Sequence, residues 1–162
     1  MGKGMITAAW LVALALLTFY FNQWLEERQN PNSRPIAMSE NGINQVILER
    51  NYQHHYVATG TINGISVTFL VDTGATTVSV PAHLADKLQL RPGVPQMTNT
   101  ANGIIETRAT TINELRLGTI TLSNVRASIN PGMRSDEILL GMSALKNIEF
   151  THRDGVLTLK QY

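Results

Sequence analysis

One long apolar segment near the N-terminus most constrains how this chain can fold. Residues 5–21, MITAAWLVALALLTFYF, contain no charged side chain. As an α-helix they would be about 26 Å long, and extension through Leu25 reaches the roughly 30 Å of a bilayer core. Aromatic side chains gather at the C-terminal end of the segment, as they do where transmembrane helices meet the membrane surface. We therefore expect residues 1–25 to be a transmembrane anchor that contacts the lipid bilayer through residues 5–25.

A cleaved signal peptide is the alternative explanation of this segment. Its apolar core would be shorter, and small residues would follow at the cleavage site, whereas bulky aromatic residues follow here. These differences favour an uncleaved anchor. Positive charges are nearly balanced across the segment, with Lys3 before it and Arg28 and Arg34 after it, so they favour a cytoplasmic N-terminus only slightly.

The rest of the chain divides into a linker and a domain. Residues 26–40, EERQNPNSRPIAMSE, are polar, contain two prolines and lack periodicity, which is typical of a linker. Residues 41–162 have an ordinary size for one domain. Hydrophobic residues make up 43% of the chain, so this domain can bury a core.

Turn signals indicate that the domain is mostly β. Short apolar runs are separated by turn residues, and Asn63-Gly64 between two such runs predicts a hairpin because both residues tolerate positive φ. Short helices are expected over residues 81–88 and 142–146. These features predict a compact all-β domain with one or two short helices, of Greek-key or barrel type.

Composition excludes several functions. The net charge is +1 and the basic residues are scattered, so no nucleic acid is expected as a partner. The chain has no cysteine, which excludes disulfides, thiolate nucleophiles and cysteine-ligated zinc. His54 and His55 would point to opposite faces of a strand, and His83 and His152 stand alone. We therefore expect histidines with structural or surface roles and no metal site.

The stretch LVDTGATT, residues 70–77, places a carboxylate directly after an apolar run. Such a carboxylate must be hydrogen-bonded or have a function. Asp72 could be held by the N–H groups of a tight turn at Thr73 and Gly74 and act as a general base towards water. A structural aspartate in an Asx turn is the alternative, since Asp-Thr-Gly occurs by chance in on the order of a few per cent of chains of this size.

Three segments place Asp72 in a longer and more specific pattern. They are VDTGAT at residues 71–76, TANG at 100–103 and LLGMS at 139–143. Together they resemble retropepsin-like aspartic proteases, in particular single-domain bacterial members with an N-terminal membrane segment. The resemblance extends over about residues 46–159. It implies a closed, barrel-like β fold and an aspartic endopeptidase that acts on a peptide or protein without a cofactor or metal ion.

The resemblance also implies roles for particular residues of the catalytic loop. Asp72 would be catalytic, Thr73 would brace two such loops across a dimer, and Gly74 would let the backbone approach the carboxylates. Ala75 completes the loop. The resemblance further implies that Leu139, Leu140 and Gly141 support this loop from below, the two leucines as core residues.

A second hairpin would cover the substrate. Residues 98–107, TNTANGIIET, are similar to the flap of this family, with Asn102 and Gly103 at the tip. Ala101 would belong to the same cover, and Ile104 with its neighbour Ile105 would lie over bound substrate. Closing such a lid excludes water. An ordinary exposed hairpin is the alternative.

The family pattern needs two Asp-Thr-Gly loops at a two-fold axis, and this chain has one. Asp86, Asp136 and Asp154 are not followed by Thr-Gly or Ser-Gly. The second carboxylate must therefore come from another copy, so the resemblance implies a homodimer in which Asp72 faces its symmetry mate. We expect a single-pass protein of a bacterial inner membrane with its protease domain in the periplasm. A non-catalytic peptide-binding or dimerisation module and an enzyme that mainly cleaves its own linker remain alternatives.

Overall fold

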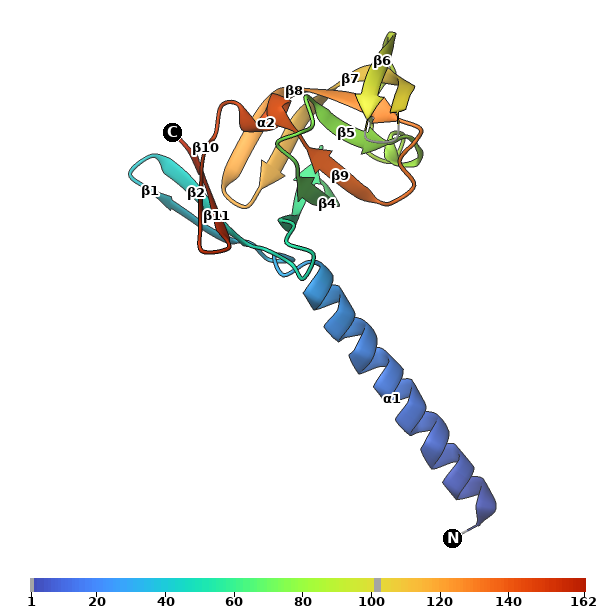
Figure 1. Ribbon diagram of the computed structural model, residues 1–162. Helices are drawn as coiled ribbons and strands as arrows, with labels where there is room; N and C mark the ends of the chain where they lie inside the picture. Colours follow the sequence, from blue (N-terminus) through green and yellow to red (C-terminus); the bar gives the residue numbers. More distant parts are fainter. Residues whose placement is uncertain (1, 101–102) are drawn as a thin grey trace.

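The computed structural model describes residues 2–100 and 103–162 and consists of a projecting helix and a β domain (Figure 1). Helix α1 (Lys3–Gln29) extends away from the domain, and the β6–β7 hairpin lies far from it. Every described side chain of α1 through Gln29 is exposed. An 18-residue stretch of this helix has a mean hydropathy of 1.9, and none of that stretch is buried against the domain. By length and composition, α1 could cross a membrane or serve as a signal sequence.

The larger sheet holds most of the domain together. Its strands follow the order β3-β4-β9-β5-β8-β7-β6, and a further pairing between β3 and β7 closes part of it into a barrel. Large apolar side chains such as Phe69, Ile112 and Ile138 are fully buried inside. The strands are β3 (Val57–Ile62), β4 (Ile65–Val71), β5 (Val78–Pro81), β6 (Pro95–Thr100), β7 (Gly103–Leu117), β8 (Ile120–Asn130) and β9 (Glu137–Leu140).

The smaller sheet joins the two ends of the domain. Its order is β1-β2-β11-β10, with antiparallel neighbours throughout. Alternate residues of its central strands, such as Val46 and Leu159, are fully buried against the core. The strands are β1 (Ile36–Glu40), β2 (Ile43–Glu49), β10 (Glu149–Arg153) and β11 (Val156–Gln161).

The segment expected to be a linker, residues 26–40, is only partly irregular. Helix α1 continues to Gln29, and residues Ile36–Glu40 form β1, which pairs with β2 from Ile36↔Ile47 to Glu40↔Ile43. Strand β1 satisfies the backbone groups along the edge of β2. The sequence of β1 shows no alternation of apolar and polar residues, because four of its five residues are exposed and both faces of the strand reach solvent.

Three expected features near the site have different outcomes. The Asn63-Gly64 hairpin is confirmed: the two residues have φ of 50° and 79° and join β3 to β4. The helix expected over residues 81–88 is wrong in extent, since only η1 (Ala82–Leu84) is helical and turns follow it. The turns leave Leu88 and Leu90 buried, so packing overrides local helix propensity here. The helix after Gly141 is confirmed as α2 (Met142–Leu145).

Candidate active site

Strand β4 delivers Asp72 into a tight turn. The Asp72 N–H donates to the Leu140 carbonyl at 3.2 Å, which fastens the strand end to β9. The Asp72 Oδ1 accepts from the Gly74 N–H at 2.8 Å, and the Ala75 N–H donates to the Asp72 carbonyl at 3.2 Å. The carboxylate is half-buried, while Thr73 and Gly74 are exposed. This turn orients the carboxylate as expected and leaves the face of the loop open.

Strand β9 supports the Asp72 loop because it lies between β4, which leads into the loop, and β5, which follows it. It pairs in parallel with β4, with Leu140 opposite Val71, and in antiparallel with β5, with Leu139 opposite Ser79. Beyond β9, the Met142 N–H donates to the Ala75 carbonyl at 2.8 Å. These contacts bring together two segments of the chain that are distant in sequence.

Gly141 is required at the point of closest approach. A Cβ atom there would meet the carbonyl oxygens of Thr77 and Ala75, the latter at 2.6 Å. Real Cβ atoms do not approach that closely, so any larger residue would push the Asp72 loop away. Gly141 therefore lies directly against the Asp72 loop.

Ser143 is a supporting residue outside the expected site set. Its Oγ accepts from the Val78 N–H at 2.9 Å and donates to the Arg126 carbonyl at 2.6 Å. It thereby joins α2 to β5 and β8 immediately below the loop. The sequence feature that could have identified Ser143 is its position directly after Leu140-Gly141-Met142.

Asp72 opens into a groove of about 530 Å³ between its loop and the β6–β7 hairpin. Residues from four further segments contribute to the walls. Among the described lining residues, Asp72 is the one that carries a charge. The described lining residues are Asp72, Gly74, Ala75, Thr76, Thr77, Ser79, Thr98, Asn99, Thr100, Ile105, Ser128, Asn130, Gly132, Met133 and Leu139.

The expected flap is a β-hairpin above this groove. Strands β6 and β7 pair in register from Pro95↔Arg108 to Thr100↔Gly103. Ile105 lines the groove, whereas Ile104 is 69% exposed and does not line it, because neighbouring strand residues point to opposite faces. Gly103 is exposed with φ 109°. Ala101 and Asn102 of the expected tip lie outside the described residues.

The two leucines of β9 differ in their surroundings. Leu140 is buried in the core, as expected. The expectation that Leu139 is a core residue is wrong, because it is half-buried and lines the groove with Asp72. The alternation of a strand explains the difference.

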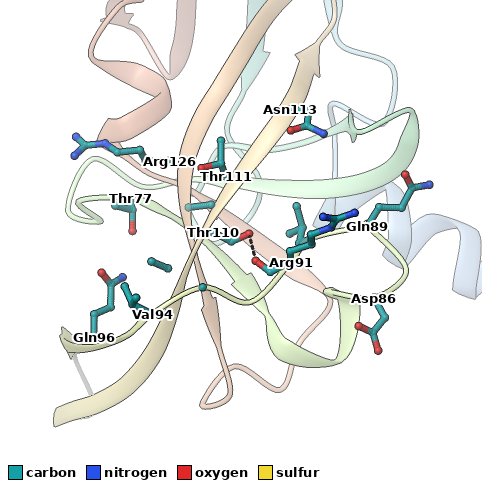
Figure 2. A pocket seen from close by; sticks show the side chains of 14 residues that line it. Thr77, Asp86, Gln89, Arg91, Val94, Gln96, Thr110, Thr111, Asn113 and Arg126 are labelled. Atoms are coloured by element: carbon teal, nitrogen blue, oxygen red, sulfur yellow. Dashed lines mark hydrogen bonds between the residues drawn. The ribbon is translucent and has the colours of Figure 1, made fainter.

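A larger hollow of about 1070 Å³ lies apart from Asp72 (Figure 2). It is formed by the segment after η1 and by β7 and β8, and Thr110 Oγ1 donates to the Arg91 carbonyl across it at 2.9 Å. Its charged side chains, Asp86, Arg91 and Arg126, are spread around its rim, and it shares Thr77 with the Asp72 groove. Among the described residues that line this hollow, no pair of catalytic groups is brought together.

Comparison with known proteins identifies the family of this site. Residues 58–147 match the family model described as gag-polyprotein putative aspartyl protease. The chain belongs to this family of retropepsin-like aspartic proteases. The match includes the Asp72 loop, the flap and Gly141. The crystal structure of a retropepsin-like aspartic protease from Rickettsia conorii has the same fold, with a TM-score of 0.59 and 24% identity, over 78% of this chain and 95% of that one.

Two curated relatives extend the comparison beyond the solved structure. An uncharacterized protein from the cobV 5′ region of Sinorhizobium sp. is 31% identical over an alignment of 154 positions, and the alignment covers 88% of this retropepsin-like chain. An uncharacterized protein of Rickettsia prowazekii (strain Madrid E) is 27% identical over an alignment of 123 positions that covers 74% of this chain. The retropepsin-like chain spans 66% and 52% of the lengths of these relatives.

Proposed function

We propose that this protein is a membrane-anchored aspartic endopeptidase, which hydrolyses peptide bonds with water activated between the two Asp72 carboxylates of a homodimer. One observation carries the proposal. An Asp-Thr-Gly loop faces a groove, and Asp72 is the one carboxylate among the described residues that line it. The family and the fold support peptidase activity.

The partner carboxylate comes from a second copy of the chain. Thr73 and Gly74 are exposed at the tip of the Asp72 loop, so two loops can meet about a two-fold axis without displacing other elements. Thr73 then braces one loop against the other. Homodimers are typical of retropepsin-like proteases, and an open loop of this kind is consistent with that assembly.

The chemistry follows from the carboxylate pair. Two carboxylates about 3 Å apart share one proton, as is general for aspartic proteases, because both cannot ionise at low cost at that distance. The ionised carboxylate takes a proton from water, and the water oxygen forms a bond to the carbonyl carbon. The protonated carboxyl donates its proton to the carbonyl oxygen. The resulting diol collapses: the C–N bond breaks, the amine nitrogen takes a proton from the pair, and one hydroxyl of the diol returns a proton to the pair as the carboxylic acid product forms.

Helix α1 provides the anchor, and the domain lies in the periplasm of a bacterium with its substrate. An apolar helix exposed all round is stable only when lipid or another apolar surface covers it. Anchoring also concentrates the copies in two dimensions and favours the dimer.

Cleavage of the chain's own linker is less consistent with the junction after α1. Asn32 is 3% exposed and its side chain makes hydrogen bonds to Glu49 and Val57. A protease needs its substrate extended and accessible, so the bonds around Asn32 must first be released. Accessible candidate bonds for self-cleavage therefore lie outside this junction.

The test compares the full-length protein with its Asp72→Asn variant, both in lipid nanodiscs, on a mixed library of short peptides. Mass spectrometry of the products measures cleavage. We expect the wild type to cleave internal peptide bonds and the variant to be inactive while keeping the same circular dichroism spectrum. Equal cleavage by both proteins, or none by either from pH 3 to 8, would support the non-catalytic binding module instead.

A further inference from the structure

The floor of the Asp72 groove carries polar side chains where the sheet alternates. In β5, Val78 and Val80 are fully buried in the core, and Ser79 between them points to the groove. Ser79 pairs directly with Ser128 of β8 and with Leu139 of β9. The two serines therefore lie side by side on the groove face, in the same row as Leu139.

The hydroxyls of this floor are bonded weakly within the chain. Ser79 Oγ donates to Met133 Sδ at 3.3 Å, and a thioether sulfur is a weak acceptor. Asn130 Nδ2 donates to Ser79 Oγ at 3.3 Å, and the Ser128 and Thr77 hydroxyl oxygens are 3.4 Å apart. A good O–H···O bond is about 2.7–2.8 Å long.

A tight hydroxyl pair in the flap provides the contrast. The Oγ1 atoms of Thr98 and Thr107 in the flap lie 2.7 Å apart, so short bonds form where the chain alone must satisfy a buried group. The hydroxyls of Ser79 and Ser128 can therefore form stronger hydrogen bonds with another polar group than they form within the chain. Ser79, Ser128 and Asn130 are 8%, 2% and 6% exposed, so that partner must enter through the groove.

We propose that this floor is a specificity pocket for an uncharged, hydrogen-bonding substrate side chain, best matched by the carboxamide of asparagine or glutamine. Ser79 and Ser128 recognise it, with Asn130 holding Ser79. The inference rests on the proposed function, because it names the substrate class of the same groove. A carboxamide offers an acceptor to Ser79 and donors to Ser128.

Apolar and charged side chains fit this pocket less well. An apolar side chain would exclude water from the hydroxyls without replacing their hydrogen bonds, and sites built to hydrogen-bond reject such analogues strongly. None of the described lining residues is a cation that could pair with an acidic side chain, and Asp72 would repel one.

Asparagine and leucine have nearly the same shape, so they form a matched pair for the test. The full-length protein in nanodiscs is given peptide mixtures in which one position at a time holds either residue. We expect kcat/KM to favour asparagine by about tenfold or more at one position near the scissile bond. The Ser79→Ala/Ser128→Ala double variant should lose that preference, and Ser79→Thr should retain it. Ser66→Ala, at an exposed serine outside the groove, should not change the preference. A preference for leucine in the wild type, or an asparagine preference that survives in the double variant, overturns the inference.

Binding separates this inference from the proposed catalysis. The Asp72→Asn variant is titrated with fluorescent asparagine and leucine peptides, and anisotropy gives the two Kd values. About tenfold tighter binding of the asparagine peptide, together with absence of cleavage by the wild type, would keep the specificity pocket and refute the protease. Equal binding, tighter binding of the leucine peptide, or no binding of either overturns the specificity pocket whether or not the wild type cleaves.

Discussion

Asn32 and Glu49 exchange two hydrogen bonds: Asn32 Nδ2 donates to the Glu49 carbonyl at 2.8 Å, and the Glu49 N–H donates to Asn32 Oδ1 at 2.7 Å. The Asn32 side chain thus pairs with the end of β2 as another strand would. Its Nδ2 also donates to the Val57 carbonyl at 2.7 Å, and its own carbonyl accepts from the Thr59 N–H at 3.0 Å. One side chain therefore ties the end of α1 to both sheets.

We expect Asn32→Ala to lower the free energy of unfolding by about 2–4 kcal/mol, because it leaves the buried carbonyl of Val57 and the part-buried N–H and carbonyl of Glu49 without these partners. Asn30→Ala is the matched control. It removes one hydrogen bond, from Asn30 Nδ2 to Thr59 Oγ1, and should cost about 1 kcal/mol. Urea unfolding of the full-length chain in detergent, followed by circular dichroism, measures both values. Equal costs would show that Asn32 does not hold the junction.

Gly141→Ala should damage both stability and activity. The added methyl would collide with the carbonyl oxygens of Thr77 and Ala75, so the Asp72 loop must move. We expect a loss of roughly 1–3 kcal/mol in unfolding free energy. Peptide cleavage should fall at least tenfold, since small displacements of catalytic groups are costly. Gly4→Ala, where nothing lies within 4 Å of the new Cβ, is the control and should change neither quantity. Unchanged cleavage by Gly141→Ala would mean that the loop tolerates the shift.

Mixing wild-type and Asp72→Asn chains tests the shared site. If each active site takes one Asp72 from each copy, only wild-type pairs cleave. Adding an equal amount of variant to a fixed amount of wild type should then reduce the cleavage rate to about half, because mixed dimers form by chance. The rate is measured with a fluorogenic peptide after co-reconstitution in the same lipid. A rate that does not change on mixing would point to an active single chain.

The pH profile should respond to Ala75, which lines the groove beside Asp72. Alanine has no hydroxyl to stabilise a charged carboxylate pair, so we expect the wild type to work at mildly acidic to near-neutral pH. A serine at this position would donate a hydrogen bond to the ionised pair. The acid limb of kcat/KM in Ala75→Ser should therefore move to lower pH. A wild-type profile confined below about pH 3 would contradict this expectation.

Helix α1 should remain attached to the domain. A chain tagged at both ends and expressed in a bacterium should yield one membrane-bound species that carries both tags, since the segment is longer than a signal-peptide core. Deleting residues 2–25 should release the domain into the soluble fraction, because the exposed apolar surface of the helix is removed. Immunoblotting for both tags, after alkaline extraction of the membranes, shows which tags remain on the membrane-bound protein. Loss of the N-terminal tag alone would identify a signal sequence.

Local chemistry explains what could be predicted. Asn63-Gly64 encodes its hairpin because both residues accept positive φ, and Asp72 with Gly74 encodes its turn within three residues. Gly141 was recognisable because its place after two apolar residues belongs to the same short pattern. In each case the local structure is set by residues that are close together in the sequence, or the residue belongs to a short sequence motif.

Other features depend on partners that are distant in the chain. The difference between Ile104 and Ile105 follows from the register of β7 against β6, and the extent of η1 follows from the burial of Leu88. Neither register nor burial can be read from a short run of residues, because several pairings satisfy the same local preferences.

The amino-acid sequence by itself determined the apolar helix, the β character of the domain, and Asp72 in its Asp-Thr-Gly turn. Only the tertiary structure decided that Asn32 and β1 are part of the domain, and that Ser79 meets Ser128 on the groove floor. The reason is physical: a turn or an apolar period is set by neighbours along the chain, whereas the hydrogen bonds of Asn32 join residues 17 and 25 positions apart. Ser79 and Ser128 are neighbours only because β5 and β8 pair across the sheet.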